Sequence, residues 1–169
     1  ADGLDIPTDE RNLIYISAKD LFAVCGKKLE GLKLIQTSNI PMARGLGSSS
    51  ACIIAGLVGA NKMLGDPLTK DDLVDLAAQI EGHPDNTAPA LLGGIVTAVF
   101  DERKVHWVKQ EVFTKLKCVA IIPDFELKTE EARACLPKEV SHKDAVYNLS
   151  RAALFSASLL TGKFENLKT

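Results

Sequence analysis

A run of glycines and serines is the part of this sequence with the clearest potential for chemistry. Residues 45–51 read Gly-Leu-Gly-Ser-Ser-Ser-Ala and lead into a segment of small and aliphatic residues. Glycines let the backbone approach an anion closely, and the first turn of a helix offers unpaired N–H groups at the positive end of its dipole. Serine hydroxyls add donors for phosphate oxygens or a ligand for magnesium. The run is neither a Walker A loop nor a G-x-G-x-x-G fingerprint, so a plain helix-capping turn is the alternative.

Other polar residues stand at helix ends and in loops. Glu81 ends a helical pattern, residues 83–86 (His-Pro-Asp-Asn) follow it, and Arg133 comes four residues after Thr129. A carboxylate can bind a divalent cation, and a guanidinium binds a carboxylate through two parallel donors. Each residue also has an ordinary interpretation, because helix-end glutamates, loop histidines and surface arginines are usually solvated and Asp-Asn is a common turn pair.

The segments around these residues predict a mixture of helices and strands. Helices are expected where apolar residues recur with helical spacing, at 9–25, 51–64, 69–80, 129–136 and 143–160. Strands are expected at 33–37, 95–100, 104–112 and 118–122. Thr69 and Asp72 have the spacing of a capping box. The sequence therefore predicts an α+β protein in which a strand, the glycine-serine loop and a helix follow one another.

The composition is that of an ordinary folded protein. With 46% hydrophobic and 25% charged residues among 169, it excludes disorder, collagen and coiled coil. A net charge of −2 favours neither nucleic acid nor an anionic membrane. The apolar stretch 51–60 is too short to span a bilayer, and the N-terminal residues show no secretory signal. Four cysteines without a C-x-x-C pair predict free thiols in a reducing cytoplasm, with two disulfides as the alternative.

Two longer motifs resemble a known superfamily. Residues 41–51, Pro-Met-Ala-Arg-Gly-Leu-Gly-Ser-Ser-Ser-Ala, resemble the ATP-binding motif of the GHMP kinases, which include galactokinases, homoserine kinases and mevalonate kinases. Residues 81–90, Glu-Gly-His-Pro-Asp-Asn-Thr-Ala-Pro-Ala, followed by Gly93-Gly94, are similar to the homoserine kinase family in particular. The runs 123–127 and 129–137 are similar to that family too, so the resemblance covers nearly the whole chain. It implies cytoplasmic transfer of the γ-phosphoryl group of ATP to the hydroxyl of L-homoserine, with Mg²⁺, in threonine biosynthesis.

The resemblance also implies roles for individual residues. The ATP phosphates are expected at Pro41, Arg44, Gly45, Leu46, Gly47, Ser48, Ser49, Ser50 and Ala51. Ser49 and Glu81 are expected to bind Mg²⁺ and, with Asn86, to form the catalytic set. L-homoserine is expected to contact His83, Asp85, Asn86, Thr129 and Arg133, with the guanidinium on its α-carboxylate. A strong general base is not required, because phosphoryl transfer depends mainly on positioning and charge neutralisation.

The fold that the resemblance implies has two parts. Residues 1–110 are expected to belong to an N-terminal ATP-binding domain of the ribosomal protein S5 type, and residues 111–169 to a ferredoxin-like C-terminal domain. The N-terminal and glycine-rich C-terminal motifs of these kinases do not occur in the sequence, so we expect an internal fragment that is inactive alone. The expected partners are ATP, L-homoserine and a second copy in a homodimer, and neither nucleic acid nor a membrane.

Three other functions stay open at this point. The nearest is another GHMP kinase that acts on mevalonate or a sugar, which a panel of acceptors would identify. A non-catalytic nucleotide-binding module would bind ATP without releasing ADP in response to any acceptor. A purely structural domain, in which the glycine-serine run only caps a helix, would bind no nucleotide.

Overall fold

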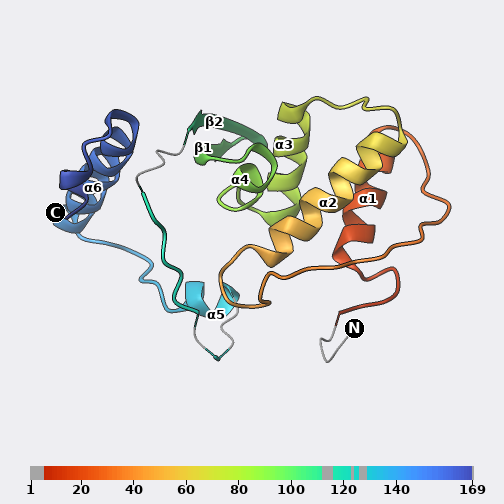
Figure 1. Cartoon of the computed structure of the whole chain (residues 1–169), viewed down its shortest axis with the longest axis horizontal. Helices are drawn as coiled ribbons and strands as arrows, with labels where there is room; N and C mark the ends of the chain where they lie inside the picture. Colours follow the sequence, from red (N-terminus) through yellow and green to blue (C-terminus); the bar gives the residue numbers. More distant parts are fainter. Residues whose placement is uncertain (1–5, 112–115, 123, 126–128, 169) are drawn as a thin grey trace. The chain divides into compact units, whose positions relative to one another are not determined.

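The structure is a computed structural model that describes residues 6–111, 116–122, 124–125 and 129–168. Its elements are listed here in chain order and labelled in Figure 1: α1 (Leu13–Val24), α2 (Ser48–Met63), α3 (Lys70–Glu81), α4 (Thr87–Leu92), β1 (Ile95–Asp101), β2 (Lys104–Gln110), α5 (Thr129–Ala134), α6 (His142–Thr161) and the 3₁₀ helix η1 (Phe164–Lys168). The chain divides into two compact units, the first made of residues 1–42 and 46–109 and the second of residues 43–45 and 110–169. The mixture of helices and strands confirms the predicted α+β class.

The core of the first unit forms where α1 and α2 cross. Leu21, Ile53 and Leu57 are at most 1% exposed. At the crossing, the backbone of α1 lies so close to Gly56 that a Cβ there would lie 2.8 Å from the Ser17 Cβ and 3.2 Å from the Ala18 nitrogen. Any side chain at residue 56 would therefore push the two helices apart.

Capping residues define the ends of α1 and α3. The Asn12 side chain accepts a hydrogen bond from the Ile14 N–H at the start of α1. Thr69 and Asp72 form the predicted capping box of α3, each side chain bonding the backbone N–H of the other. Gly82 ends α3 with a φ of 86°, a conformation that favours glycine. The caps confirm the predicted start of α3 at Thr69, whereas α1 begins at Leu13, four residues after its predicted start at residue 9, because Asn12 caps it.

The two strands of the first unit form a hairpin. β1 and β2 pair in a two-stranded sheet, and the residues between them, Glu102 and Arg103, have φ values of 44° and 71°. Two consecutive positive φ values are typical of two-residue hairpin turns, whose backbone twist fits the right-handed twist of the paired strands. The hairpin packs on α3 and α4 through a second apolar cluster of Val74, Ala78, Ala88 and Val105 (Figure 1).

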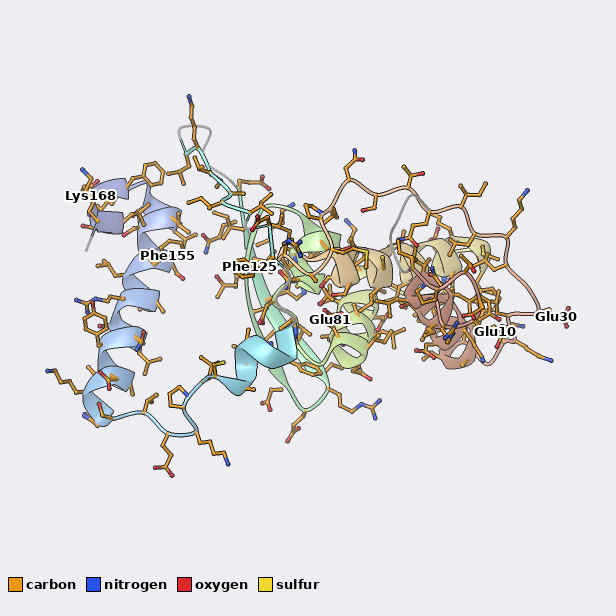
Figure 2. All side chains as sticks on the ribbon, turned by 90° about the horizontal axis from the view of Figure 1, so that it is seen from below. Glu10, Glu30, Glu81, Phe125, Phe155 and Lys168 are labelled. Carbon is orange, nitrogen blue, oxygen red and sulfur yellow. The ribbon has the colours of Figure 1, made fainter. Side chains whose placement is uncertain are left out.

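The second unit is mainly helical in its described part. Ser141 caps α6, because its hydroxyl accepts from the Asp144 N–H, and Gly162 ends the helix in a left-handed conformation. Much of the apolar surface of α6 is exposed: Figure 2 labels Phe155, which is 53% exposed. In sequence this helix has the amphipathic spacing of a packed helix, and its predicted bounds are confirmed within one residue of each end.

Two predicted strands are absent from the structure. Neither residues 33–37 nor residues 118–122 have the ladder of hydrogen bonds that makes a strand, since the sheet in the described part of the chain contains only β1 and β2. Ile35 is 82% exposed and Ile121 is 92% exposed. Both predictions were wrong for this chain, because a β-prone sequence becomes a strand only where another strand pairs with it. The short helix α4 was not predicted.

Candidate functional site

The glycine-serine loop leaves the start of α2 without a cap. Gly47 is the N-cap residue and its φ is 74°, and within the described part of the chain no side chain caps the first turn of the helix. The first backbone bond of the helix runs from the Ala51 N–H to the Gly47 carbonyl, so the N–H groups of residues 48–50 have no partner within the helix. No acidic residue lies in this turn. The N-terminal end of α2 therefore offers an anion unpaired N–H donors and the positive end of the helix dipole.

Glu81, on α3, contacts the start of α2 through its side chain. It is the last residue of α3 and is labelled in Figure 2. Its Oε1 accepts a hydrogen bond of 2.8 Å from the exposed Ser49 hydroxyl and one of 3.3 Å from the buried Ser50 hydroxyl. Ser50 is 1% exposed. The structure thus brings together the two residues predicted to bind a metal ion, although they lie 32 positions apart in the sequence.

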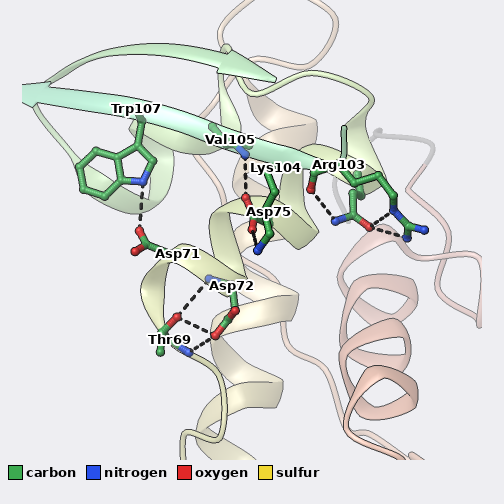
Figure 3. A network of polar contacts seen from close by, with 9 residues as sticks. Thr69, Asp71, Asp72, Asp75, Arg103, Lys104, Val105 and Trp107 are labelled. Carbon is green, nitrogen blue, oxygen red and sulfur yellow. Dashed lines mark hydrogen bonds and ion pairs between the residues drawn. The ribbon is translucent and has the colours of Figure 1, made fainter. Parts of the chain in front are cut away.

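A row of polar contacts holds α3 against the hairpin and so fixes where Glu81 lies. Asp71, Asp75 and Gln79 follow one another at intervals of four and share one face of the helix. Figure 3 shows their partners along β2 and its turn: Trp107 Nε1 donates to Asp71, the Val105 N–H and Lys104 Nζ donate to Asp75, and Arg103 pairs with Gln79.

Asp75 is the buried centre of this row. It is 8% exposed, and both of its donors lie 2.7 Å from a carboxylate oxygen. The hydrogen bond to Asp75 raises the pKa of Lys104, so the lysine stays charged in the pair. At the start of the same helix, the donors of Thr69 lower the pKa of Asp72. These contacts give α3 a single register on the hairpin.

The loop after α3 carries the predicted substrate-binding residues next to the glycine-serine loop. Asn86 lies against Gly47, because a Cβ at Gly47 would be 3.7 Å from the Asn86 Cβ. The Nδ1 of His83 is buried and has no hydrogen-bond partner among the described residues, because Asp85 Oδ2, 3.8 Å away, is too far to accept one. A buried polar atom without a partner is costly, so the His83 ring is suited to a polar ligand.

An open cavity of about 750 Å³ begins beside Ser48. Its lining comes from residues 6–12, from residues 30–42 and from Tyr15 on α1. Two polar side chains of this lining contact each other, because Asn12 Nδ2 donates to Gln36 Oε1 at 3.3 Å. Gln36 also bonds Cys52, and burial raises the pKa of that thiol, so Cys52 is protonated at neutral pH.

The remaining predicted residues belong partly to the other unit. Pro41, Leu46 and Ala51 lie in the first unit with the serines, whereas Arg44, Gly45 and Arg133 lie in the second. Within the second unit, Arg44 Nη2 donates to the Asp124 carbonyl at 3.1 Å, and Arg133 is exposed in the last turn of α5. The side chain of Thr129 is outside the described part of the chain.

The described residues contain neither a cluster of metal-binding side chains nor a disulfide bond. Among them, no three His, Cys, Asp or Glu side chains gather closely enough to hold a metal ion. All four cysteines are free thiols. No helix in the described ranges combines the length and apolar character needed to cross a bilayer.

Sequence patterns missed two features of this site. The Ser50 hydroxyl was expected on a phosphate, and its contact with Glu81 has no local signal, because the two residues come from different helices. The row on α3 had a signal, the spacing of Asp71, Asp75 and Gln79, but a polar helix face is normally solvated and its partners on β2 were not evident.

Comparisons with known proteins give one consistent result. Residues 12–94 match the family described as GHMP kinases N terminal domain. The chain is 52% identical to a homoserine kinase of Clostridium beijerinckii over 161 residues, which cover 95% of this chain and 54% of that protein. A homoserine kinase of Petrotoga mobilis is 49% identical over 162 residues, covering 96% of this chain and 53% of its own. A crystal structure of homoserine kinase from Cytophaga hutchinsonii superposes with a TM-score of 0.81 at 30% identity, covering 98% of this chain and 54% of that one. The chain spans about half the length of the curated relatives it matches.

Proposed function

Because the chain belongs to the GHMP kinase superfamily, we propose that the full-length protein is a homoserine kinase, which transfers the γ-phosphoryl group of ATP to the side-chain hydroxyl of L-homoserine. The products are O-phospho-L-homoserine and ADP. The identity of the acceptor rests on the names of relatives that are up to 52% identical to this chain. One structural observation carries the catalytic part: the hydrogen bond of 2.8 Å between Ser49 and Glu81 joins the phosphate loop to a carboxylate.

The start of α2 and the cavity beside it support nucleotide binding. We assign the phosphates to the loop and to the backbone N–H groups of residues 48–50, which have no partner within the helix. A phosphate chain held there would lead past Ser48 into the 750 Å³ cavity, which is large enough for a nucleoside. Asn12, Gln36 and Tyr15 would supply its polar and aromatic contacts.

The donor set of Ser49 and Glu81 fits a magnesium ion that arrives with the nucleotide. Magnesium prefers oxygen ligands and is usually held by one or two protein groups together with substrate phosphates. The hydroxyl and the carboxylate are both oxygen donors, and they face the same uncapped helix end. When bound, the ion would neutralise charge on the β- and γ-phosphates. A partly formed site of this kind is consistent with the lack of any three-residue cluster among the described residues.

The acceptor is assigned to the loop after α3. The unpaired Nδ1 of His83 and the exposed side chains of Asp85 and Asn86 offer hydrogen bonds to an amino acid beside Gly47. Thr129 and Arg133 join this set on the strength of the resemblance alone. Their proposed role is to hold the amino acid by its carboxylate, for which a guanidinium provides two parallel donors.

The cellular setting is part of the same proposal. We place the reaction in the cytoplasm and in threonine biosynthesis, and the four free cysteines are consistent with a reducing compartment. A homodimer also stays a prediction, which light scattering on the full-length protein tests.

Steady-state kinetics of the full-length protein test the residue roles. With L-homoserine and Mg-ATP, Glu81→Gln is expected to lower kcat by about 100-fold or more, the scale of losing one group that stabilises transition-state charge. Arg133→Ala is expected to raise the KM for L-homoserine and to change kcat little. Glu139→Gln is the matched control, because Glu139 is an exposed glutamate in the second unit. If both variants keep the kinetic constants of the control, the assigned roles are wrong.

A further inference from the structure

Two adjacent serines contact the same oxygen of Glu81 from different environments. Ser49 is exposed, whereas Ser50 is 1% exposed, and the two hydroxyls donate to Oε1 over 2.8 and 3.3 Å respectively. Glu81 accepts no other hydrogen bond from the part of the chain that the structure describes. A buried hydroxyl cannot turn to water, so Ser50 depends on Glu81 for its partner.

Glu81 lies where its own helix does not favour it. A carboxylate at the C-terminal end of a helix meets the negative end of the helix dipole, and the last turn of α3 contains no basic residue. The start of α2 is the positive end of another dipole and carries both serines. The side chain of Glu81 is therefore held by α2 rather than by α3.

We propose that Ser50 is a positioning residue, whose buried hydroxyl keeps the Glu81 carboxylate beside Ser49 when the Ser49 oxygen binds the metal-nucleotide complex. This inference rests on the proposed function, because it presumes that Ser49 and Glu81 receive the metal ion. Ser49, exposed at the surface, can change partners, while Ser50 cannot reach solvent. In this proposal the Ser50 backbone N–H binds phosphate, whereas the Ser50 hydroxyl donates a hydrogen bond to the Glu81 carboxylate.

Metal binding to the full-length protein tests this role without relying on turnover. Mn²⁺ is titrated in the presence of a non-hydrolysable ATP analogue, and free Mn²⁺ is measured by electron paramagnetic resonance. Ser50→Ala is expected to weaken Mn²⁺ binding by about tenfold or more, the lower end of the range for losing one hydrogen bond to a charged group. Ser50→Cys, of similar size but a weaker donor, is expected to fall between Ser50→Ala and the unsubstituted protein.

Ser17→Ala is the matched control. Ser17 is also a fully buried helical serine, but its hydroxyl bonds the Leu13 carbonyl of its own helix at 2.8 Å. Its removal is expected to leave Mn²⁺ binding unchanged, and thermal unfolding of each variant verifies that it folds. A loss of Mn²⁺ affinity in Ser17→Ala equal to that in Ser50→Ala would overturn the inference.

Glu81→Gln distinguishes the proposal that Glu81 binds the metal ion from the proposal that Ser50 positions Glu81. If Glu81→Gln weakens Mn²⁺ binding while Ser50→Ala does not, the positioning role is wrong and the proposed metal ligand stands. If neither substitution changes Mn²⁺ binding, Glu81 is not a metal ligand and both proposals fail. If Ser50→Ala weakens binding of the analogue equally with and without Mn²⁺, the hydroxyl acts on the phosphates and the inference is overturned.

Discussion

Asp75 gives a quantitative prediction, because its two carboxylate oxygens do different things. Oδ1 accepts from the Val105 N–H, a buried backbone donor, while Oδ2 pairs with Lys104, whose side chain is 68% exposed (Figure 3). Asp75→Asn keeps an acceptor for the N–H and loses only the ion pair, which at such exposure is worth at most about 1 kcal/mol. Asp75→Ala also leaves the buried N–H unpaired, which costs a further ~1–3 kcal/mol.

Urea unfolding of the full-length protein, followed by circular dichroism, measures the difference. We expect Asp75→Asn to lower the free energy of unfolding by no more than about 1 kcal/mol, and Asp75→Ala to lower it by a further ~1–3 kcal/mol. Asp71→Asn is the control, because Asp71 accepts its bond from Trp107 at an exposed position. Equal losses in the two Asp75 variants would refute the reasoning, since they would show that charge, and not the buried N–H, determines the cost.

Two further predictions concern packing and pH. Gly56→Ala should destabilise the protein by about 2 kcal/mol, because the close approach of α1 outweighs the gain of about 1 kcal/mol in helix propensity. Gly59 has open space around it, so Gly59→Ala should be neutral or stabilising. Thermal unfolding of both variants measures the difference. Thr69→Ala should cost about 1 kcal/mol at neutral pH. Since Thr69 lowers the pKa of Asp72 below its ordinary 3.8, the stabilisation is present above that pH and is lost as the pH falls through the lower value of the folded state. The difference in stability between Thr69→Ala and the unsubstituted protein, measured as a function of pH, should therefore narrow in acid, and a constant difference would contradict this account.

The features that the sequence predicted well are those set by short-range interactions. The capping box of Thr69 and Asp72 depends on residues three positions apart, and both partners are visible in one turn of helix. The glycine-serine loop also precedes a helix as predicted, although α2 begins at Ser48, three residues before its predicted start at residue 51. The helical spacing of apolar residues, which is also a short-range pattern, predicted α1 and α6.

The features that could not be predicted depend on partners distant in the sequence or absent from it. Residues 33–37 have strand composition, but pairing requires a neighbour that the described chain does not provide. Ser50 and Glu81 meet only because α2 and α3 pack together, and no local pattern distinguishes Ser50 from the serines that face solvent. Burial of a single hydroxyl is a property of the packed fold, so it becomes visible only in three dimensions.

Acceptor-dependent ADP release by the full-length protein is the measurement that tests the central claim most directly. Mg-ATP is supplied with L-homoserine, mevalonate or galactose, each at the same concentration, and ADP is measured over time. The account predicts release with L-homoserine alone. Release with mevalonate or galactose would contradict the assigned acceptor, and ATP binding without release of ADP for any of the three would contradict the proposal that the protein is a kinase.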